Sequence, residues 1–279
     1  MSGDTAPKLM QPKEYKSSVK PVWCPGCGDF GVLGSITKAL SGLQIQPESA
    51  AVISGIGCSS RMPTYLKTYG FHGVHGRALA LATGLKVARP DLTVIATGGD
   101  GDGFSIGGNH FLHTCRRNPD MTYIVMDNQV YGMTKGQASP TTDPSWEKGK
   151  LTPCGTGVNP FQPLVIALAS GANFIARCSS SDSNGTARVI MEAIKHPGFS
   201  MVQILSPCVT FRPEQREWKN LLVPAPVEAT SDPAQAARRL LTDEGLFTGV
   251  LYVGDRPAYQ PCPENRIDSI AELDEEFCI

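Results

Sequence analysis

The sequence has no long apolar run, no excess of charge of one sign, no internal repeat and no low-complexity tract. A membrane-spanning helix needs roughly 20 apolar residues, so we expect no contact with a membrane. The 25 basic and 26 acidic residues give a formal net charge of -1, which argues against nucleic-acid binding. The first residues, MSGDTAPKLMQPKEYKSS, lack the apolar core of a signal peptide, so we expect a cytoplasmic protein.

What is present points to a globular protein. A chain of 279 residues fits one large domain, or one domain with an extension. Its 9 cysteines, in a cytoplasmic protein, are expected to be metal ligands, reactive thiols or buried small side chains rather than disulfides.

Apolar stretches alternate with segments of helical spacing along most of the chain. Residues 92–99 (LTVIATGG) and 121–127 (MTYIVMD) are continuous apolar runs, as in strands buried within a parallel sheet. Residues 29–43 place apolar side chains near helical intervals. The alternation predicts an α/β fold, a doubly wound parallel sheet over residues 1–222. Residues 223–279 are expected to form a C-terminal extension that packs on this domain or on a partner, with a solvated acidic tail.

A glycine-rich turn follows the strand that ends near residue 97. The sequence GGDGDG lets backbone N–H groups approach an anion at the start of a helix. Asp100 within this turn would repel a phosphate unless a divalent cation lay between them. Asn128 ends the next strand and offers a second oxygen ligand, so this edge of the sheet is predicted to bind Mg²⁺ and a phosphate group.

The segment WCPGCGDF contains a CxxC pair, Cys24 and Cys27. Such a pair can bind zinc, act as a redox dithiol, or form one edge of an iron-sulfur cluster. Cys58 and Cys208 both follow predicted strands, so the doubly wound topology can bring four thiolates together beside the glycine turn.

Several motifs in order resemble one family. GGDGDGFSIG followed by DNQVYGMTKGQASPTT resembles the thiamine diphosphate motif of the β subunits of 2-oxoacid:ferredoxin oxidoreductases. WCPGCGDFGVL, GIGCSSR, HGRALALATGLKVARPDL and LSPCVTF resemble the same family, over residues 20 to about 212. The shorter chain and KPVWCPGCGDFGVL favour the 2-oxoglutarate branch.

The resemblance implies thiamine diphosphate, Mg²⁺ and a 4Fe-4S cluster as cofactors, with coenzyme A as cosubstrate. Mg²⁺ would be bound by Asp100, Asn128 and the carbonyl of Val130, and the cluster by Cys24, Cys27, Cys58 and Cys208. The cofactor-binding residues would be Ile56, Gly57, Cys58, Ser59, His75, Gly76, Gly99, Asp100, Gly101, Asp102, Asn128, Val130, Tyr131, Gly132, Met133 and Thr134. Among these, Gly99, Gly101 and Asp102 would frame the diphosphate.

Two residues are expected to be catalytic by the same resemblance. Lys135 would bind the carboxylate of the 2-oxoacid, and His75 would lie against thiamine diphosphate. The glutamate that activates the aminopyrimidine ring is assigned to an α subunit, because one sheet leaves no room for a second domain. We therefore expect a heterodimer, or a dimer of heterodimers, that passes electrons to ferredoxin.

Three alternatives remain open at this point. A pyruvate:ferredoxin oxidoreductase β subunit would share all these motifs. A non-oxidative thiamine diphosphate enzyme would explain the glycine turn but would leave the four cysteines unused. A zinc-stapled scaffold would explain the cysteines and make the glycine turns purely structural.

Overall fold

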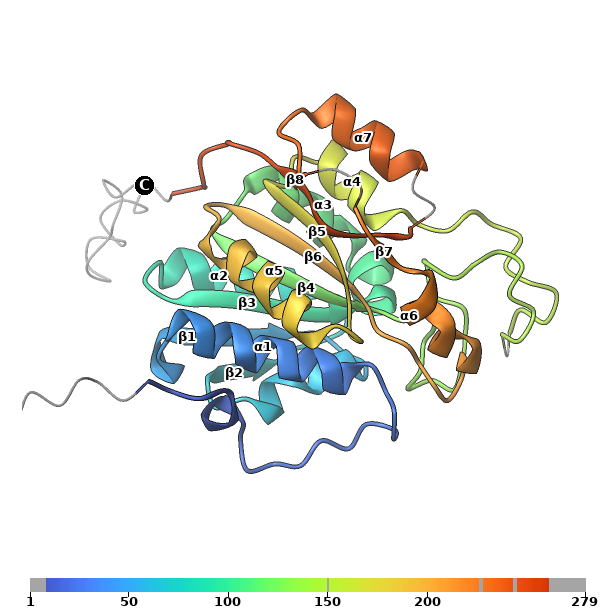
Figure 1. The fold of residues 1–279 in the computed structure, drawn as a ribbon, viewed down its shortest axis with the longest axis horizontal. Coiled ribbons are helices and arrows are strands. Elements are labelled where there is room, and N and C mark those ends of the chain that lie inside the picture. Colours follow the sequence, from blue (N-terminus) through green and yellow to red (C-terminus); the bar gives the residue numbers. More distant parts are fainter. Residues whose placement is uncertain (1–8, 150, 226–227, 243–244, 261–279) are drawn as a thin grey trace, which may run out of the picture.

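A computed structural model describes residues 9–149, 151–225, 228–242 and 245–260. Within this part of the chain, one sheet of eight strands has the order β2-β1-β3-β4-β6-β5-β8-β7 (Figure 1). The acidic tail, with Cys262 and Cys278, is expected to be solvated, and it lies outside the described residues.

The strands and helices follow the alternation seen in the sequence. The strands are β1 (Ala50–Ser54), β2 (Tyr69–His72), β3 (Thr93–Gly99), β4 (Met121–Asp127), β5 (Phe174–Ser179), β6 (Phe199–Leu205), β7 (Val223–Pro224) and β8 (Phe247–Val253). The α-helices are α1 (Asp29–Leu43), α2 (Ala78–Ala88), α3 (Gly108–Arg117), α4 (Pro163–Ala169), α5 (Ser183–Lys195), α6 (Trp218–Leu221) and α7 (Pro233–Thr242). Short helical turns are η1 (Pro12–Tyr15), η2 (Pro47–Ser49), η3 (Ser59–Tyr65), η4 (Asp102–Ile106) and η5 (Pro213–Glu217).

Helices cover both faces of the sheet, as Figure 1 shows. On one face α1 packs against α5, and Ile36, Leu40 and Ile190 join inward side chains of the central strands in one core cluster. On the other face α2, α3, α4 and α7 enclose a second cluster that includes Phe111 and Leu164. Every residue of β1, β4 and β6 is buried, which explains why these strands are mostly apolar.

The predicted doubly wound parallel sheet is confirmed for β1 to β6. The strand β8 differs because it pairs antiparallel with β5. Residues 223–253, assigned to a C-terminal extension, therefore contribute the last two strands of the same sheet.

A second difference lies between β3 and α3. The segment SIGGNHFLHTCRR, residues 105–117, is predicted from the sequence to be a helix, whereas residues 102–106 form an irregular wide turn with Ser105 at φ -92° and ψ -106°. The regular helix begins only at Gly108. Gly107 allows the end of this turn to pack closely, because a Cβ there would lie 2.5 Å from the Asp102 carbonyl oxygen.

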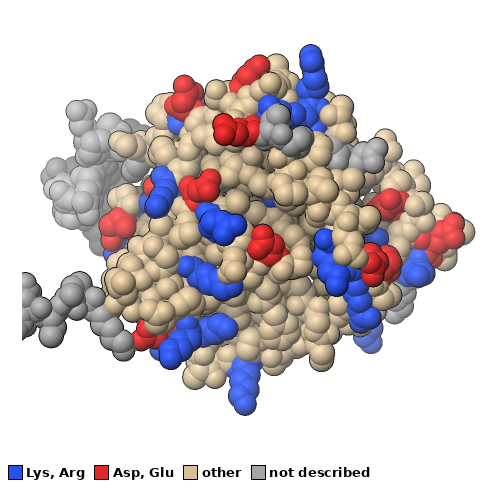
Figure 2. All heavy atoms as spheres, in the orientation of Figure 1, with Lys and Arg blue, Asp and Glu red and all other residues tan. Residues whose placement is uncertain are grey.

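The strand order brings the carboxyl ends of β1, β3, β4 and β6 to one edge of the sheet, where ligands bind in doubly wound proteins. On the face shown in Figure 2, basic and acidic side chains are interspersed, in keeping with the small net charge. No helix within the described residues has both the length and the apolar character needed to cross a bilayer.

Candidate functional site

The carboxyl edge of the sheet contains a cavity of about 140 Å³ between the ends of β1, β3 and β4. All of the predicted cofactor residues line it except Gly76, and Met126 is the one lining residue not predicted. Gly76 lies directly behind the wall, where its N–H donates to Asp102 Oδ1 at 2.8 Å. The fold thus brings together residues from four separate segments of the sequence.

The predicted Mg²⁺ ligands lie at adjacent strand ends. Asp100 is 2% exposed, and its Oδ1 accepts the Asn128 backbone N–H at the long distance of 3.5 Å. The Asn128 side-chain oxygen accepts the Val130 N–H at 3.1 Å, which folds these residues into a tight turn. A carboxylate, an amide oxygen and a backbone carbonyl are the hard oxygen donors that Mg²⁺ prefers.

Burial raises the pKa of Asp100, and the nearby carboxylate of Asp127 raises it further. The pKa of Asp127 is raised by burial as well. A divalent cation beside two such buried carboxyl groups would stabilise their ionised forms. The donor set and its electrostatics therefore fit a magnesium ion.

The glycines of the turn keep the cavity open. A Cβ at Gly101 would lie 2.3 Å from Cε1 of Tyr131, and a Cβ at Gly99 would lie 3.2 Å from Ser59 Oγ. The Tyr131 hydroxyl also donates to the Gly101 carbonyl at 3.0 Å, which fixes the turn against the next loop. Only glycine leaves the backbone accessible here, as a cradle for a diphosphate requires.

Asp102 holds three segments of the cavity wall together. Its Oδ1 accepts the N–H groups of Ile56, at 2.9 Å, and Gly76, at 2.8 Å. It also lies 2.6 Å from Nδ1 of His75. The carboxylate is 3% exposed and faces Gly55, where a Cβ would lie 2.0 Å from Oδ2. Asp102 lines the cavity as predicted. Its side chain binds the backbone of the cavity wall and orients His75.

The four predicted cluster ligands gather beside this cavity. The CxxC turn is closed by the Cys27 N–H, which donates to the Cys24 carbonyl at 3.0 Å. It is joined to the loop after β6 by the Gly28 N–H, which donates to the Pro207 carbonyl at 3.1 Å. The thiol of Cys58 interacts electrostatically with Cys24 and Cys208, and that of Cys27 interacts with Cys58 and Cys208.

The environment of the thiols disfavours free thiolates. Burial raises the pKa of Cys27, and the carboxylate of Asp29 raises it further. Burial, followed by Asp29, raises the pKa of Cys58 to about 11. Thiols of this kind are inert as nucleophiles and become thiolates when they bind metal.

No three His, Cys, Asp or Glu side chains among the described residues lie close enough to hold one metal ion. Each thiolate of a 4Fe-4S cluster binds a different iron, so its ligands stand farther apart than those around one ion. Four thiols that meet from three segments fit such a cluster.

The two centres share a wall. Cys58 lines the cavity, and a Cβ at Gly132, also in the lining, would lie 3.6 Å from Cys58 Sγ and 3.9 Å from Cys208 Sγ. Gln215 links the same loops, because its Oε1 accepts the Cys208 N–H at 2.9 Å and its Nε2 donates to the Asn128 carbonyl at 2.7 Å. Gln215 is fully buried. One side chain therefore holds both Cys208, a predicted cluster ligand, and Asn128, a predicted magnesium ligand.

The loop after β4 places two predicted cofactor residues in the cavity lining, next to Lys135, the predicted substrate residue. Met133 and Thr134 line the cavity, and Lys135 follows them as an exposed residue with φ 73°. This left-handed conformation is unusual for lysine. The turn is held by the Gly136 N–H, which donates to the Tyr131 carbonyl at 2.9 Å, and it presents Lys135 to solvent.

Several residues of the site were not predicted from the sequence. Gln215 contacts the loops of both predicted centres, and Asp127 lies close to Asp100. Ser139 and Thr141, in the loop between β4 and α4, donate to Asp100. Only Asp127 has a visible sequence signal, as a charged residue that ends the apolar run MTYIVMD. The others depend on contacts between distant segments.

Comparison with known proteins identifies related chains. Residues 55–204 match the thiamine pyrophosphate enzyme family, C-terminal TPP binding domain. The β subunit of 2-oxoacid:ferredoxin oxidoreductase 2 of Aeropyrum pernix is 41% identical over 254 residues, which cover 86% of this chain and 82% of that protein. Subunit KorB of the 2-oxoglutarate oxidoreductase of Mycobacterium tuberculosis is 48% identical over 199 residues, which cover 71% of this chain and 53% of KorB, about half its length.

A solved structure shares the whole fold. It is the 2-oxoglutarate:ferredoxin oxidoreductase from Magnetococcus marinus, with 2-oxoglutarate, coenzyme A and succinyl-CoA bound. The TM-score is 0.87 at 42% identity, and the alignment covers 96% of this chain and 90% of that chain. The chain therefore belongs to the thiamine pyrophosphate enzymes, and within them to the β subunits of 2-oxoacid:ferredoxin oxidoreductases.

Proposed function

We propose that the chain is the β subunit of a 2-oxoacid:ferredoxin oxidoreductase. The reaction converts a 2-oxoacid and coenzyme A to acyl-CoA and CO₂, and its electrons pass through a 4Fe-4S cluster to ferredoxin. One observation carries the proposal: Gly132 lines the cavity that contains Asp100 and Asn128, and a Cβ at Gly132 would lie 3.6 Å from Cys58 Sγ and 3.9 Å from Cys208 Sγ. Electron transfer between two cofactors needs such proximity.

The chain's own residues have distinct tasks. The side chains of Asp100 and Asn128 and the Val130 carbonyl would hold Mg²⁺, and the backbone at Gly99 and Gly101 would receive the diphosphate. When bound, thiamine diphosphate supplies the electron sink for decarboxylation, and the cluster accepts the electrons one at a time.

His75 and Lys135 act at the substrate end of the cavity in this proposal. Asp102 fixes Nδ1 of His75 at 2.6 Å, which orients the ring and leaves Nε2 for contact with the cofactor or substrate. Lys135 would supply a positive charge to the carboxylate of the 2-oxoacid.

The substrate class follows from the relatives. KorB of Mycobacterium tuberculosis and the enzyme from Magnetococcus marinus are named for 2-oxoglutarate, and the latter was solved with it and coenzyme A bound. We assign 2-oxoglutarate as the preferred substrate, with pyruvate as the alternative. An assay with both acids, side by side, decides between them by kcat/KM.

An α subunit completes the active site in this proposal. It supplies the glutamate that activates the aminopyrimidine ring and most of the contacts with coenzyme A, within a heterodimer or a dimer of heterodimers. The complex is assigned to the cytoplasm, where its thiols stay reduced. Turnover by the isolated β subunit would contradict the shared active site.

Two variants of the complex, purified without oxygen, test the two cofactor sites separately. Asp100→Ala is expected to abolish Mg²⁺-dependent binding of thiamine diphosphate while about four irons per chain remain. Cys208→Ser is expected to lose the cluster and its visible absorption while thiamine diphosphate still binds. Both should stop the 2-oxoacid-dependent reduction of ferredoxin. Stoichiometric zinc in place of iron would refute the proposal.

A further inference from the structure

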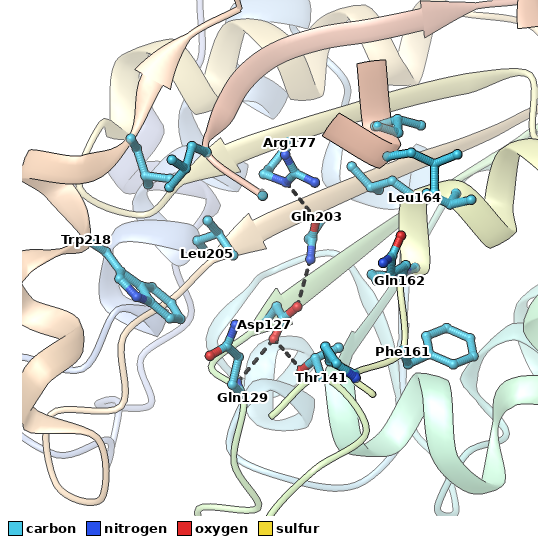
Figure 3. Close-up of a pocket in the computed structure, with 18 of the residues that line it drawn as sticks. Asp127, Gln129, Thr141, Phe161, Gln162, Leu164, Arg177, Gln203, Leu205 and Trp218 are labelled. Atoms are coloured by element: carbon cyan, nitrogen blue, oxygen red, sulfur yellow. Dashed lines mark hydrogen bonds between the residues drawn. The ribbon is translucent and has the colours of Figure 1, made fainter. Parts of the chain in front are cut away.

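Asp127 is a buried carboxylate beside the magnesium site, and the proposed ligand set leaves it without a role. It is the last residue of β4 and is 1% exposed. Its Oδ1 accepts the Thr141 hydroxyl at 2.9 Å and the Gln129 N–H at 3.1 Å, and its Oδ2 accepts Nε2 of Gln203 at 2.7 Å (Figure 3). Because both oxygens already accept protein donors, Asp127 is placed to act on the metal site through its neighbours.

The neighbour that connects it to the site is Thr141. The Thr141 hydroxyl lies 2.9 Å from Asp127 Oδ1 and also 2.9 Å from Asp100 Oδ2. Ser139 donates to the same Oδ2 of Asp100. These contacts hold one oxygen of Asp100 against the loop. Among the described residues, the other oxygen has only the 3.5 Å contact with the Asn128 N–H, which leaves it free for a cation.

Asp127 is itself held from the opposite side. Gln203 of β6 accepts Nε of Arg177 of β5 at 3.0 Å, and Nη1 of Arg177 donates to the Phe247 carbonyl at 3.2 Å. Gln203 and Arg177 are register partners in the sheet and are 5% and 6% exposed. In Figure 3 they lie in line with Asp127 along the wall of a second cavity of about 360 Å³. A buried series of hydrogen bonds from Arg177 through Gln203 keeps the Asp127 carboxylate in one orientation.

The charges of Asp100 and Asp127 also indicate that Asp127 affects the metal site. A hydroxyl group has one proton, so at any moment Thr141 donates to only one of its two carboxylate neighbours, Asp100 or Asp127, although both lie 2.9 Å away. With two carboxylates around one donor, a nearby dication relieves their repulsion.

We propose that Asp127 is a positioning residue for the metal ligand Asp100, that it acts through the Thr141 hydroxyl, and that its charge raises the affinity for Mg²⁺. The inference rests on the proposed function, because the magnesium site is part of it. Loss of an outer partner of a metal ligand typically weakens metal binding about 10- to 100-fold.

Direct measurement of metal binding tests the inference. The complete complex is stripped with a chelator and titrated with Mn²⁺ in the presence of thiamine diphosphate, and free Mn²⁺ is read by electron paramagnetic resonance. Asp127→Asn and Thr141→Val are each expected to weaken Mn²⁺ binding about 10- to 100-fold. Thr141→Ser keeps the hydroxyl and should bind as the wild type does.

Asp143→Asn is the matched control. It removes one charge from the same loop at an exposed position whose carboxylate accepts only local bonds from Ser145. It should leave Mn²⁺ binding unchanged. Iron content and the unfolding temperature report whether each variant has folded.

The inference fails if folded Asp127→Asn and Thr141→Val bind Mn²⁺ as the wild type does. It also fails if Thr141→Ser is as weak as Thr141→Val, since packing rather than the hydroxyl would then matter. If Asp127→Asn does not fold, the two Thr141 variants decide. A wild-type complex that binds neither Mn²⁺ nor thiamine diphosphate would overturn the proposed function itself, which is a different result.

Discussion

The three bonds to Asp102 make it the most sensitive single position in the cavity wall. Asp102→Ala removes the acceptor for the N–H groups of Ile56 and Gly76 and the partner of His75. Gly76 is buried, so its N–H would be left without a partner, whereas the N–H of Ile56 is only partly buried. An unsatisfied buried group costs about 1–3 kcal/mol, so we expect a total loss of stability of about 3 kcal/mol.

The loss can be followed as a change in unfolding temperature. For chains of this size, 1 kcal/mol corresponds to roughly 2–4 °C, so Asp102→Ala is expected to lower the midpoint by about 6–12 °C. Asp102→Asn keeps one side-chain oxygen as an acceptor and should lose about a third as much, or about 1 kcal/mol. Thermal unfolding of the purified chain, followed by circular dichroism, measures both.

Asp91→Asn provides the control for a change of the same type on the surface. Asp91 pairs with Arg89 at 2.6 Å, but both side chains are more than half exposed. The midpoint of this variant should not move. If Asp102→Ala shifted the midpoint no more than Asp91→Asn does, Asp102 would not be the group that holds the wall together.

Three further predictions concern the loop, the glycine turn and a histidine. Lys135→Ala should lower kcat/KM for the 2-oxoacid about 10- to 100-fold, the value of a charge-assisted bond, and unchanged kinetics would remove Lys135 from the substrate site. Gly101→Ala should displace the Tyr131 ring, cost about 1–3 kcal/mol and weaken thiamine diphosphate binding in calorimetry; normal binding would mean that the turn adapts. Burial lowers the pKa of His196, so its contribution to stability is complete above about pH 6.5 and is lost as the pH falls. Urea unfolding at pH 7.5 and 5.5 should therefore show a smaller acid loss in His196→Gln than in the wild type, and equal losses would contradict this.

The fold was predictable where local pattern and burial agree. The helix expected over residues 29–43 is α1 with the same bounds, because its apolar positions face the sheet and the chain turns at Gln44 with φ 51°. The direction of β8 was not predictable. Its sequence FTGVLYV suits a parallel or an antiparallel neighbour equally, and only its connection through α7 sets the direction.

The site was predictable to the extent that it consists of strand ends. Parallel strands place their carboxyl ends at one edge, so Cys58, Asp100 and Asn128 had to be neighbours. Gln215 and Thr141 could not be found in this way. Gln215 lies in the short helical turn η5 after β6, and Thr141 lies in the loop between β4 and α4. Neither position has a periodicity that indicates its partner.

The thiols of the proposed cluster also constrain how the protein matures. Cys24 and Cys27 are synthesised about 180 residues before Cys208, which follows β6, and β6 must insert between β4 and β5. Iron can therefore be fully coordinated only after most of the sheet has formed. Incorporation of the cluster would then close a long loop of the polypeptide, because it would join the Cys24–Cys27 turn to the segment that follows β6.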